Sequence, residues 1–117
     1  MNFILKLIIT TLAVILVSYI LPGVHVDSIM TALIVACILA FLNTIIKPLL
    51  VLFTLPLTII TLGLFLLVIN AIIIILTDKL VDGFAVKNFG VALLFSILLS
   101  ITTSVLEMLS GSNRNNP

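Results

Sequence analysis

The sequence carries very little charge. Five basic and four acidic side chains are spread over 117 residues, whereas 63% of the residues are hydrophobic and the mean hydropathy is +1.56. A water-soluble domain of this size needs a polar shell, which so few ionised side chains cannot form. The composition therefore excludes a soluble globular domain and indicates an integral membrane protein in contact with membrane lipid. The net charge of +1 gives no electrostatic argument for binding nucleic acid.

Reactive side chains are also scarce. Cys37 is the single cysteine and His25 the single histidine, so one chain supplies neither a disulfide framework nor a cysteine or histidine metal cluster. No pair of carboxylates lies at the centre of an apolar segment, no glycine-rich phosphate loop is present, and the serines and threonines lack a neighbouring base. We therefore predict that the protein is not an enzyme and needs no cofactor, and no small-molecule substrate is identified.

Long apolar segments make up most of the chain. They run roughly over residues 3 to 21, 29 to 46, 62 to 77 and 89 to 106, lengths that fit membrane-spanning helices although the third is short. The first segment has no small-x-small cleavage site and is followed by similar segments, so we interpret it as a retained span. The sequence predicts an all-α integral membrane protein with four transmembrane helices.

An internal repeat suggests how these helices are arranged. A shift of 60 residues aligns LPGVHVDSIMTALIVACILA (21–40) with VDGFAVKNFGVALLFSILLS (81–100) without gaps. The aligned identities include Gly23 with Gly83, Val26 with Val86, Ala32 with Ala92 and Leu33 with Leu93. We predict two helical hairpins, residues 1–43 and 62–106, related as a parallel repeat about an axis along the membrane normal. Residues 44–61 would link them on one membrane face, and residues 107–117 would form a disordered tail.

The linker between the hairpins has one polar stripe on an apolar helix. On a helical wheel Lys47, Thr54, Thr58 and Thr61 point in nearly one direction, close to that of Asn43. Pro48 suits the first turn of a helix, and Pro56 predicts a bend because it lacks an N–H group. An interfacial helix fits this pattern best, with Lys47 reaching water and phosphate. A re-entrant segment is the alternative.

Small and amide side chains recur inside the predicted spans. The small residues follow a spacing of four in both halves, at Ala32, Ala36 and Ala40 and at Ala92, Ser96 and Ser100. This spacing allows helix backbones to approach closely, so we predict that the second and fourth spans pack near the repeat axis, although these residues could also be simple filling. Asn43 and Asn70 are expected to form interhelical hydrogen bonds, with a transport site as the alternative.

A longer pattern resembles a known family. The run N-x-x-x-K-P-L-L-x-L-x-T-L-P-L-T-I-x-T-L-G-L-F-x-x-x-x-N (43–70) and the later D-G-F-A-V-K-N-F (82–89) look like the four-spanning phage holin family, holin superfamily IV. The resemblance covers nearly the whole chain and implies a bacterial or phage inner-membrane protein. Many members are encoded on bacterial chromosomes without lysis cassettes. Holins accumulate, oligomerise and open a lesion, and many end in a strongly basic tail, whereas this tail carries Arg114 alone.

Three functional hypotheses follow. The first is a non-enzymatic, self-associating protein of the holin type, a homo-oligomer that forms pores or lesions in the inner membrane. The second is a non-conducting structural or envelope-stress protein whose Lys47 binds anionic headgroups, and the third is a small-solute or lipid transporter. The placement of Lys6, Lys47 and Arg114 on one face and Lys79 and Lys87 on the other favours cytoplasmic termini.

Overall fold

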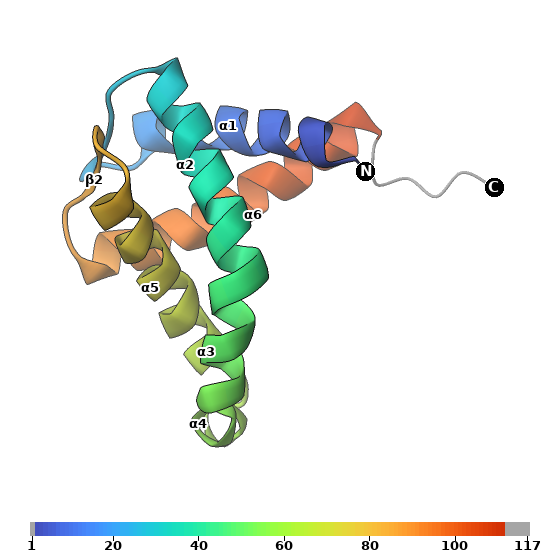
Figure 1. The fold of residues 1–117 in the computed structure, drawn as a ribbon, viewed down its shortest axis with the longest axis vertical. Helices are drawn as coiled ribbons and strands as arrows, with labels where there is room; N and C mark the ends of the chain where they lie inside the picture. Colours follow the sequence, from blue (N-terminus) through green and yellow to red (C-terminus); the bar gives the residue numbers. More distant parts are fainter. Residues whose placement is uncertain (1, 112–117) are drawn as a thin grey trace.

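The computed structural model describes residues 2–111, which are mostly helical (Figure 1). In chain order the elements are α1 (Phe3–Ile20), β1 (Val24–Val26), α2 (Ile29–Phe41), the π-helical turn η1 (Leu42–Ile46), α3 (Lys47–Phe53), α4 (Leu55–Ile60), α5 (Phe65–Leu80), β2 (Phe84–Val86) and α6 (Phe89–Ser110). Within this part of the chain three helices are long and apolar enough to cross a membrane: Phe3–Ile20, Ile29–Phe53 and Phe89–Ser110. The third predicted span corresponds to α5, which has only 16 residues.

The helices form two arms that diverge from a common end (Figure 1). In the first arm α1 packs along α6, and in the second arm α5 packs along α2 and α3. The arms meet at the end that carries β1 and β2, where α1 also contacts α2 and α5 contacts α6. The start of α1 and the end of α6 lie together at the free end of the first arm, where Lys6 Nζ is 3.5 Å from Glu107 Oε2. The short helix α4 forms the tip of the second arm.

The second helix is longer than the sequence predicted. The expected span ended at residue 46 and the linker began at 44, whereas α2, η1 and α3 form one helical rod over Ile29–Phe53. Pro48 would normally interrupt a helix because it has no N–H group and its ring crowds the preceding turn. Here the chain widens into a π-helical turn just before Pro48, where the Lys47 N–H donates to the Leu42 carbonyl. Helix geometry therefore continues past the proline to Phe53.

The chain reverses direction at the tip of the second arm. The break at Thr54 separates α3 from α4, and a turn over residues 61–64 leads into α5. Leu62 and Gly63 both have left-handed backbone angles, with φ of 57° and 89°. The Gly63 N–H donates to the Thr58 carbonyl over 2.8 Å and closes this turn. Residues 44–61 thus form the end of one helix, a break at Thr54 and the short helix α4, not a single linker helix.

Two short strands join the loops of the two predicted hairpins. Strands β1 and β2 are antiparallel, with Val24 opposite Val86, His25 opposite Ala85 and Val26 opposite Phe84. At the ribbon's ends, the Asp27 N–H donates to the Gly83 carbonyl over 2.9 Å and the Lys87 N–H donates to the Gly23 carbonyl over 2.8 Å. These two hydrogen bonds are equivalent under the 60-residue repeat, because Asp27 corresponds to Lys87 and Gly83 corresponds to Gly23. Both loops consequently lie at the same end of the molecule.

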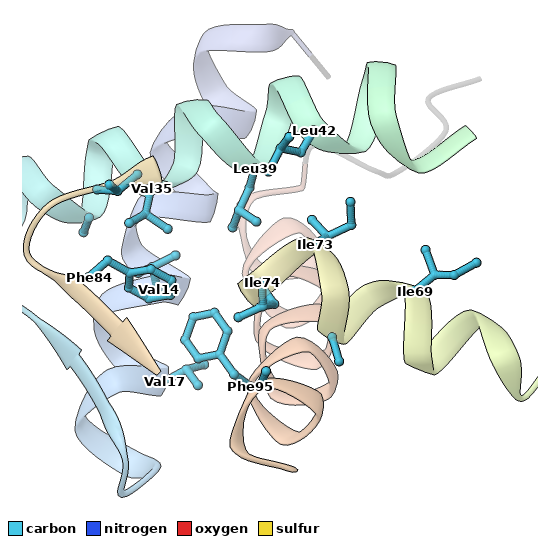
Figure 2. Close-up of a cluster of buried hydrophobic side chains, with 14 residues drawn as sticks. Val14, Val17, Val35, Leu39, Leu42, Ile69, Ile73, Ile74, Phe84 and Phe95 are labelled. Carbon is cyan, nitrogen blue, oxygen red and sulfur yellow. The ribbon is translucent and has the colours of Figure 1, made fainter. Parts of the chain in front are cut away.

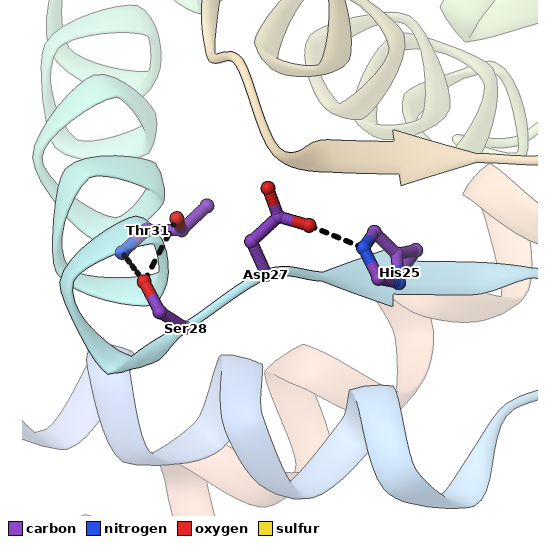
Figure 3. Close-up of polar contacts among 4 residues, drawn as sticks. All are labelled: His25, Asp27, Ser28 and Thr31. Atoms are coloured by element: carbon purple, nitrogen blue, oxygen red, sulfur yellow. Dashed lines mark hydrogen bonds and ion pairs between the residues drawn. The ribbon is translucent and has the colours of Figure 1, made fainter.

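The N-terminal caps of α2 and α6 are also equivalent under the 60-residue repeat. Ser28 caps α2 by accepting a hydrogen bond from the Thr31 N–H over 3.2 Å, and Asn88 caps α6 by accepting one from the Val91 N–H over 2.9 Å. Figure 3 shows the cap at Ser28. It also shows the contact between Nε2 of His25, which lies in β1, and Oδ1 of Asp27, which directly follows β1. Gly23 and Gly83, which are also 60 residues apart, have φ of 95° and 90°.

The apolar core lies between the arms near the ribbon (Figure 2). It combines side chains from six elements: Val14 and Val17 of α1, Val35 and Leu39 of α2, Leu42 of η1, Ile73 and Ile74 of α5, Phe84 of β2 and Phe95 of α6 are among them. The rings of Phe84 and Phe95 are tilted against each other with their centroids 5.7 Å apart. This core joins the two predicted hairpins where their helices converge.

The final helix extends beyond its predicted end. The sequence placed the start of a disordered tail at residue 107, but α6 runs to Ser110 and ends at Gly111, whose φ is 74°. A glycine in the left-handed conformation is a common way to end a helix. Residues 107–110 are therefore helical, and residues 112–117 of the expected tail, including Arg114, lie outside the described residues.

Candidate functional site: a polar cleft between the two arms

Two adjoining cavities lie between the arms, away from the ribbon. The first has a volume of about 220 Å³ and is lined by residues of α1, α2, η1 and α6. The second has a volume of about 90 Å³ and lies between α2, η1, α3, α5 and α6. Asn43 and Ser100 line both cavities, so the two form one site. We call this site the polar cleft, and its polar side chains are Lys6, Thr10, Asn43, Lys47, Asn70, Ser96, Ser100 and Thr103.

Six of these eight polar positions have a counterpart 60 residues away that also lines the cleft. Thr10 corresponds to Asn70, and Asn43 corresponds to Thr103. Both pairs lie outside the aligned segments 21–40 and 81–100, so the repeat extends beyond them. Within those segments, Ser96 and Ser100 correspond to Ala36 and Ala40, which line the larger cavity. Each half of the chain therefore contributes equivalent positions to the cleft.

The charged residues break this pattern. Glu107 occupies the position equivalent to Lys47, and it forms an ion pair with Lys6 in the first arm. Lys47 is half-buried in the second arm and forms no ion pair with any carboxylate among residues 2–111. Among the described residues, the Lys47 charge on one side of the cleft thus has no carboxylate partner.

The structure places both predicted amides in this cleft, together with Lys47 in the smaller cavity. Asn43 lies in η1 and is exposed, whereas Asn70 lies in α5 and is half-buried. Among the described residues neither side chain makes a hydrogen bond, so the expected interhelical bonds are not formed within one chain. An amide left unpaired in hydrocarbon costs a few kcal/mol. Within residues 2–111 both amides are therefore available to bind a further group.

The threonines of the predicted polar stripe lie apart from Lys47, at the tip of the second arm. The Thr54 hydroxyl donates to the Leu50 carbonyl over 2.8 Å, and the Thr61 hydroxyl donates to the Leu57 carbonyl over 3.0 Å. Thr61 also accepts a hydrogen bond from the Phe65 N–H over 3.1 Å. Thr58 is buried and its hydroxyl has no partner among the described residues. Thr54 and Thr61 thus serve the turn, and the stripe does not lie on one helix.

The predicted small-residue positions lie on the inner faces of α2 and α6. Ala32, Ala36, Ala92 and Ser96 are buried, Ala40 is half-buried and Ser100 is exposed. The extensive contacts of α2 are with α1 and α5, and those of α6 are with α1 and α5. The expected α2–α6 packing is therefore replaced by a separation across the polar cleft, with Ala36 and Ala40 on one side and Ser100 on the other.

Sequence reasoning missed three members of the cleft: Lys6, Thr10 and Thr103. Thr10 and Thr103 could have been found by extending the repeat beyond residues 21–40, because they match Asn70 and Asn43. Lys6 carries no such signal, since the equivalent position is Leu66. Its place in the cleft follows from the packing of α1 along α6.

Comparison with known proteins adds to this geometry. Residues 1–105 match the family model described as mycobacterial 4 TMS phage holin, superfamily IV. The chain belongs to this family. It is 42% identical over 97 residues to the uncharacterized membrane protein YvlD of Bacillus subtilis (strain 168), an alignment that covers 82% of each chain. It is 39% identical over 82 residues to the uncharacterized protein SCO3922 of Streptomyces coelicolor, covering 67% of this chain and 66% of that protein. No solved structure matches it.

Membership confirms the predicted family and a membrane protein, and the family is described as having four spans. The family description names four spans, whereas three helices of the described residues are long and apolar enough to cross a membrane, and α5 is not one of them. At about 1.5 Å per residue, α5 would be roughly 24 Å long, slightly less than a hydrocarbon core of about 30 Å.

Proposed function

We propose that this holin-family protein is a non-enzymatic membrane protein that self-associates in the bacterial inner membrane through its polar cleft. The observation that carries the proposal is the pair of amides, Asn43 and Asn70, which face the cleft without hydrogen-bond partners among the described residues. Polar side chains in membrane spans associate with one another or line water. Neighbouring copies of the chain, and water held between them, would supply the missing partners.

We further propose that the chain is two duplicated hairpins with parallel orientation. The pairing of β1 with β2, the matching caps at Ser28 and Asn88 and the paired cleft positions all support this arrangement. The ribbon would lie at one membrane face, and the start of α1, the tip at α4 and the end of α6 would lie at the other. The distribution of lysines favours the cytoplasm for the second face.

In this arrangement the tip of the second arm lies at the membrane interface. The continuous helix Ile29–Phe53 has 25 residues and would be roughly 37 Å long, so it must tilt to fit a core of about 30 Å. The tip exposes Phe53, Ile60 and Leu62, which are 78%, 76% and 92% exposed, and apolar side chains of this kind avoid water. An interfacial position satisfies both features.

Induced expression with a membrane-potential dye, combined with counting of subunits by single-molecule photobleaching in native membranes, tests this proposal. We expect oligomers and depolarisation for the natural sequence, and a several-fold loss of both for the double variant Asn43→Leu, Asn70→Leu. Cys37→Leu is the matched control, because Cys37 is exposed on α2 and does not line the cleft. Monomers with an unchanged potential at high expression would refute the proposal. Oligomers without depolarisation would refute the formation of pores or lesions, which we propose as the consequence of self-association, and would leave self-association standing.

A further inference from the structure

Lys47 lies where a lipid headgroup could reach it. It follows Ile29 by 18 positions in the continuous helix, which is about 27 Å along the helix axis. If Ile29 is at the membrane face that carries the ribbon, a tilted helix brings Lys47 to the region just inside the opposite headgroups. Long lysine side chains extend from such positions to the interface. The charge is half-buried and has no carboxylate partner among residues 2–111.

Asn43 and Lys47 also border a second, apolar groove. This groove has a volume of about 450 Å³ and continues along α3 to the tip, where Pro48, Val51, Leu52 and Leu55 line it. The smaller cavity of the polar cleft lies on the other side of the same two residues and contains Asn70 and Ser100. One lysine and one amide therefore separate a polar pocket from an apolar groove.

We propose that this composite site binds an anionic phospholipid. The phosphodiester would accept hydrogen bonds from the Lys47 ammonium and from the N–H groups of the Asn43 amide, while one acyl chain would occupy the apolar groove; the Asn43 carbonyl oxygen and the Asn70 amide would remain for the contacts between copies. A phosphate would pair with the lysine charge and accept from the Asn43 amide at once, whereas the groove offers no polar group beyond Asn43 and Lys47. An amphiphile matches this juxtaposition better than a free anion, which would leave the groove empty.

The site exists in one half of the chain only. At the position equivalent to Lys47 the first arm has Glu107, whose carboxylate pairs with Lys6 and would repel a phosphate. We therefore expect one lipid per chain, held by the second arm. The inference rests on the proposed placement of the cleft inside the membrane, but not on pore formation.

Native mass spectrometry of the full-length chain released from vesicles tests the lipid site. Vesicles of phosphatidylglycerol mixed with phosphatidylcholine would be used, with Lys47→Gln compared with the control Lys79→Gln, an exposed lysine near the ribbon end of α5. We expect one retained phosphatidylglycerol per chain and a loss of about 10-fold in its occupancy for Lys47→Gln, as for removal of one charge-assisted hydrogen bond. The control should retain the lipid, and Lys47→Arg should retain most of it.

A second variant separates the lipid from a free anion and from misfolding. Val51→Trp fills the apolar groove while leaving Lys47 in place, so it should lower phosphatidylglycerol occupancy and leave the helical circular dichroism unchanged. Displacement of the lipid by millimolar inorganic phosphate, with no effect of Val51→Trp, would overturn the lipid assignment in favour of an anion site. Equal retention of both lipids by the natural sequence and Lys47→Gln would overturn the site altogether. Retained self-association in that case would leave the proposed function standing.

Discussion

At the scale of single residues, the glycines show how closely the two loops meet. Gly23, Gly63 and Gly83 all have positive φ, a conformation that side chains with a Cβ atom adopt at a cost of about 1–2 kcal/mol. Their surroundings differ. A Cβ atom on Gly83 would lie 2.6 Å from Asp27 Oδ2 in the other loop, whereas one on Gly63 would meet nothing within 4 Å. Gly83 is thus required both by its backbone and by the contact between loops.

This contrast predicts a graded effect of alanine substitutions. Gly63→Ala should lower the free energy of unfolding by about 1 kcal/mol through backbone strain alone. Gly83→Ala should lower it by about 2 kcal/mol or more, because Asp27 must also move. Gly90→Ala in the first turn of α6 is the control and should be neutral or stabilising by about 0.5 kcal/mol, since φ is not positive there and the nearest atom is at 3.5 Å. Denaturant titration in detergent micelles measures all three, and equal losses at Gly63 and Gly83 would contradict the account.

Individual residues differ in how far the sequence could assign them. Gly23 and Gly83 were recognisable because a turn glycine followed by Val at the same spacing recurs in both halves. Asn43, Asn70 and Lys47 were identified as polar residues in apolar surroundings, but their convergence on one cleft was not predicted, because it depends on how α2, α3 and α5 pack. The ion pair of Lys6 with Glu107 joins opposite ends of the chain and has no local signature.

At the scale of elements, the starts of α2 and α6 are set by equivalent caps. The Ser28 hydroxyl and the Asn88 amide oxygen each accept a hydrogen bond from the N–H three residues later. Such caps satisfy N–H groups that have no partner within the helix. We expect Ser28→Ala and Asn88→Ala each to lower the free energy of unfolding by about 1 kcal/mol.

The double variant tests whether these caps act independently. Its loss should equal the sum of the two single losses, since the caps are on different helices. Ser104→Ala, an exposed position inside α6, is the control and should change the free energy of unfolding by less than about 0.5 kcal/mol. If Ser104→Ala lowered the free energy of unfolding as much as Asn88→Ala, the loss at Asn88 could not be attributed to its capping hydrogen bond.

The boundaries of the second helix illustrate the limits of prediction from local sequence. Pro48 is usually a sign that a helix begins or ends, and its position predicts the start of a new helix. The π-helical turn that lets the rod continue to Phe53 has no simple sequence signature. The reversal at the tip depends on Leu62 with φ of 57°, a conformation that is not expected for leucine.

At the scale of the whole molecule, the two arms and the ribbon make an open shape with polar groups in the angle between the arms (Figure 1). The helical, membrane-protein character of the chain could be derived from the length and composition of its apolar segments. The angle between the arms could not be derived in this way. It depends on how core side chains from distant parts of the chain, such as Phe84 and Phe95, pack together near the ribbon (Figure 2). Such an open angle leaves room in the membrane for lipid, water or another copy of the chain.

The proposed parallel hairpins are tested most directly by cysteine labelling in intact and inverted membrane vesicles. Starting from the Cys37→Ala variant, single cysteines would be placed at His25 and Ala85, which face each other in the ribbon, and at Leu62 in the exposed tip. The account predicts that a membrane-impermeant maleimide labels positions 25 and 85 from one side and position 62 from the other. Labelling of positions 25 and 85 from opposite sides would contradict it.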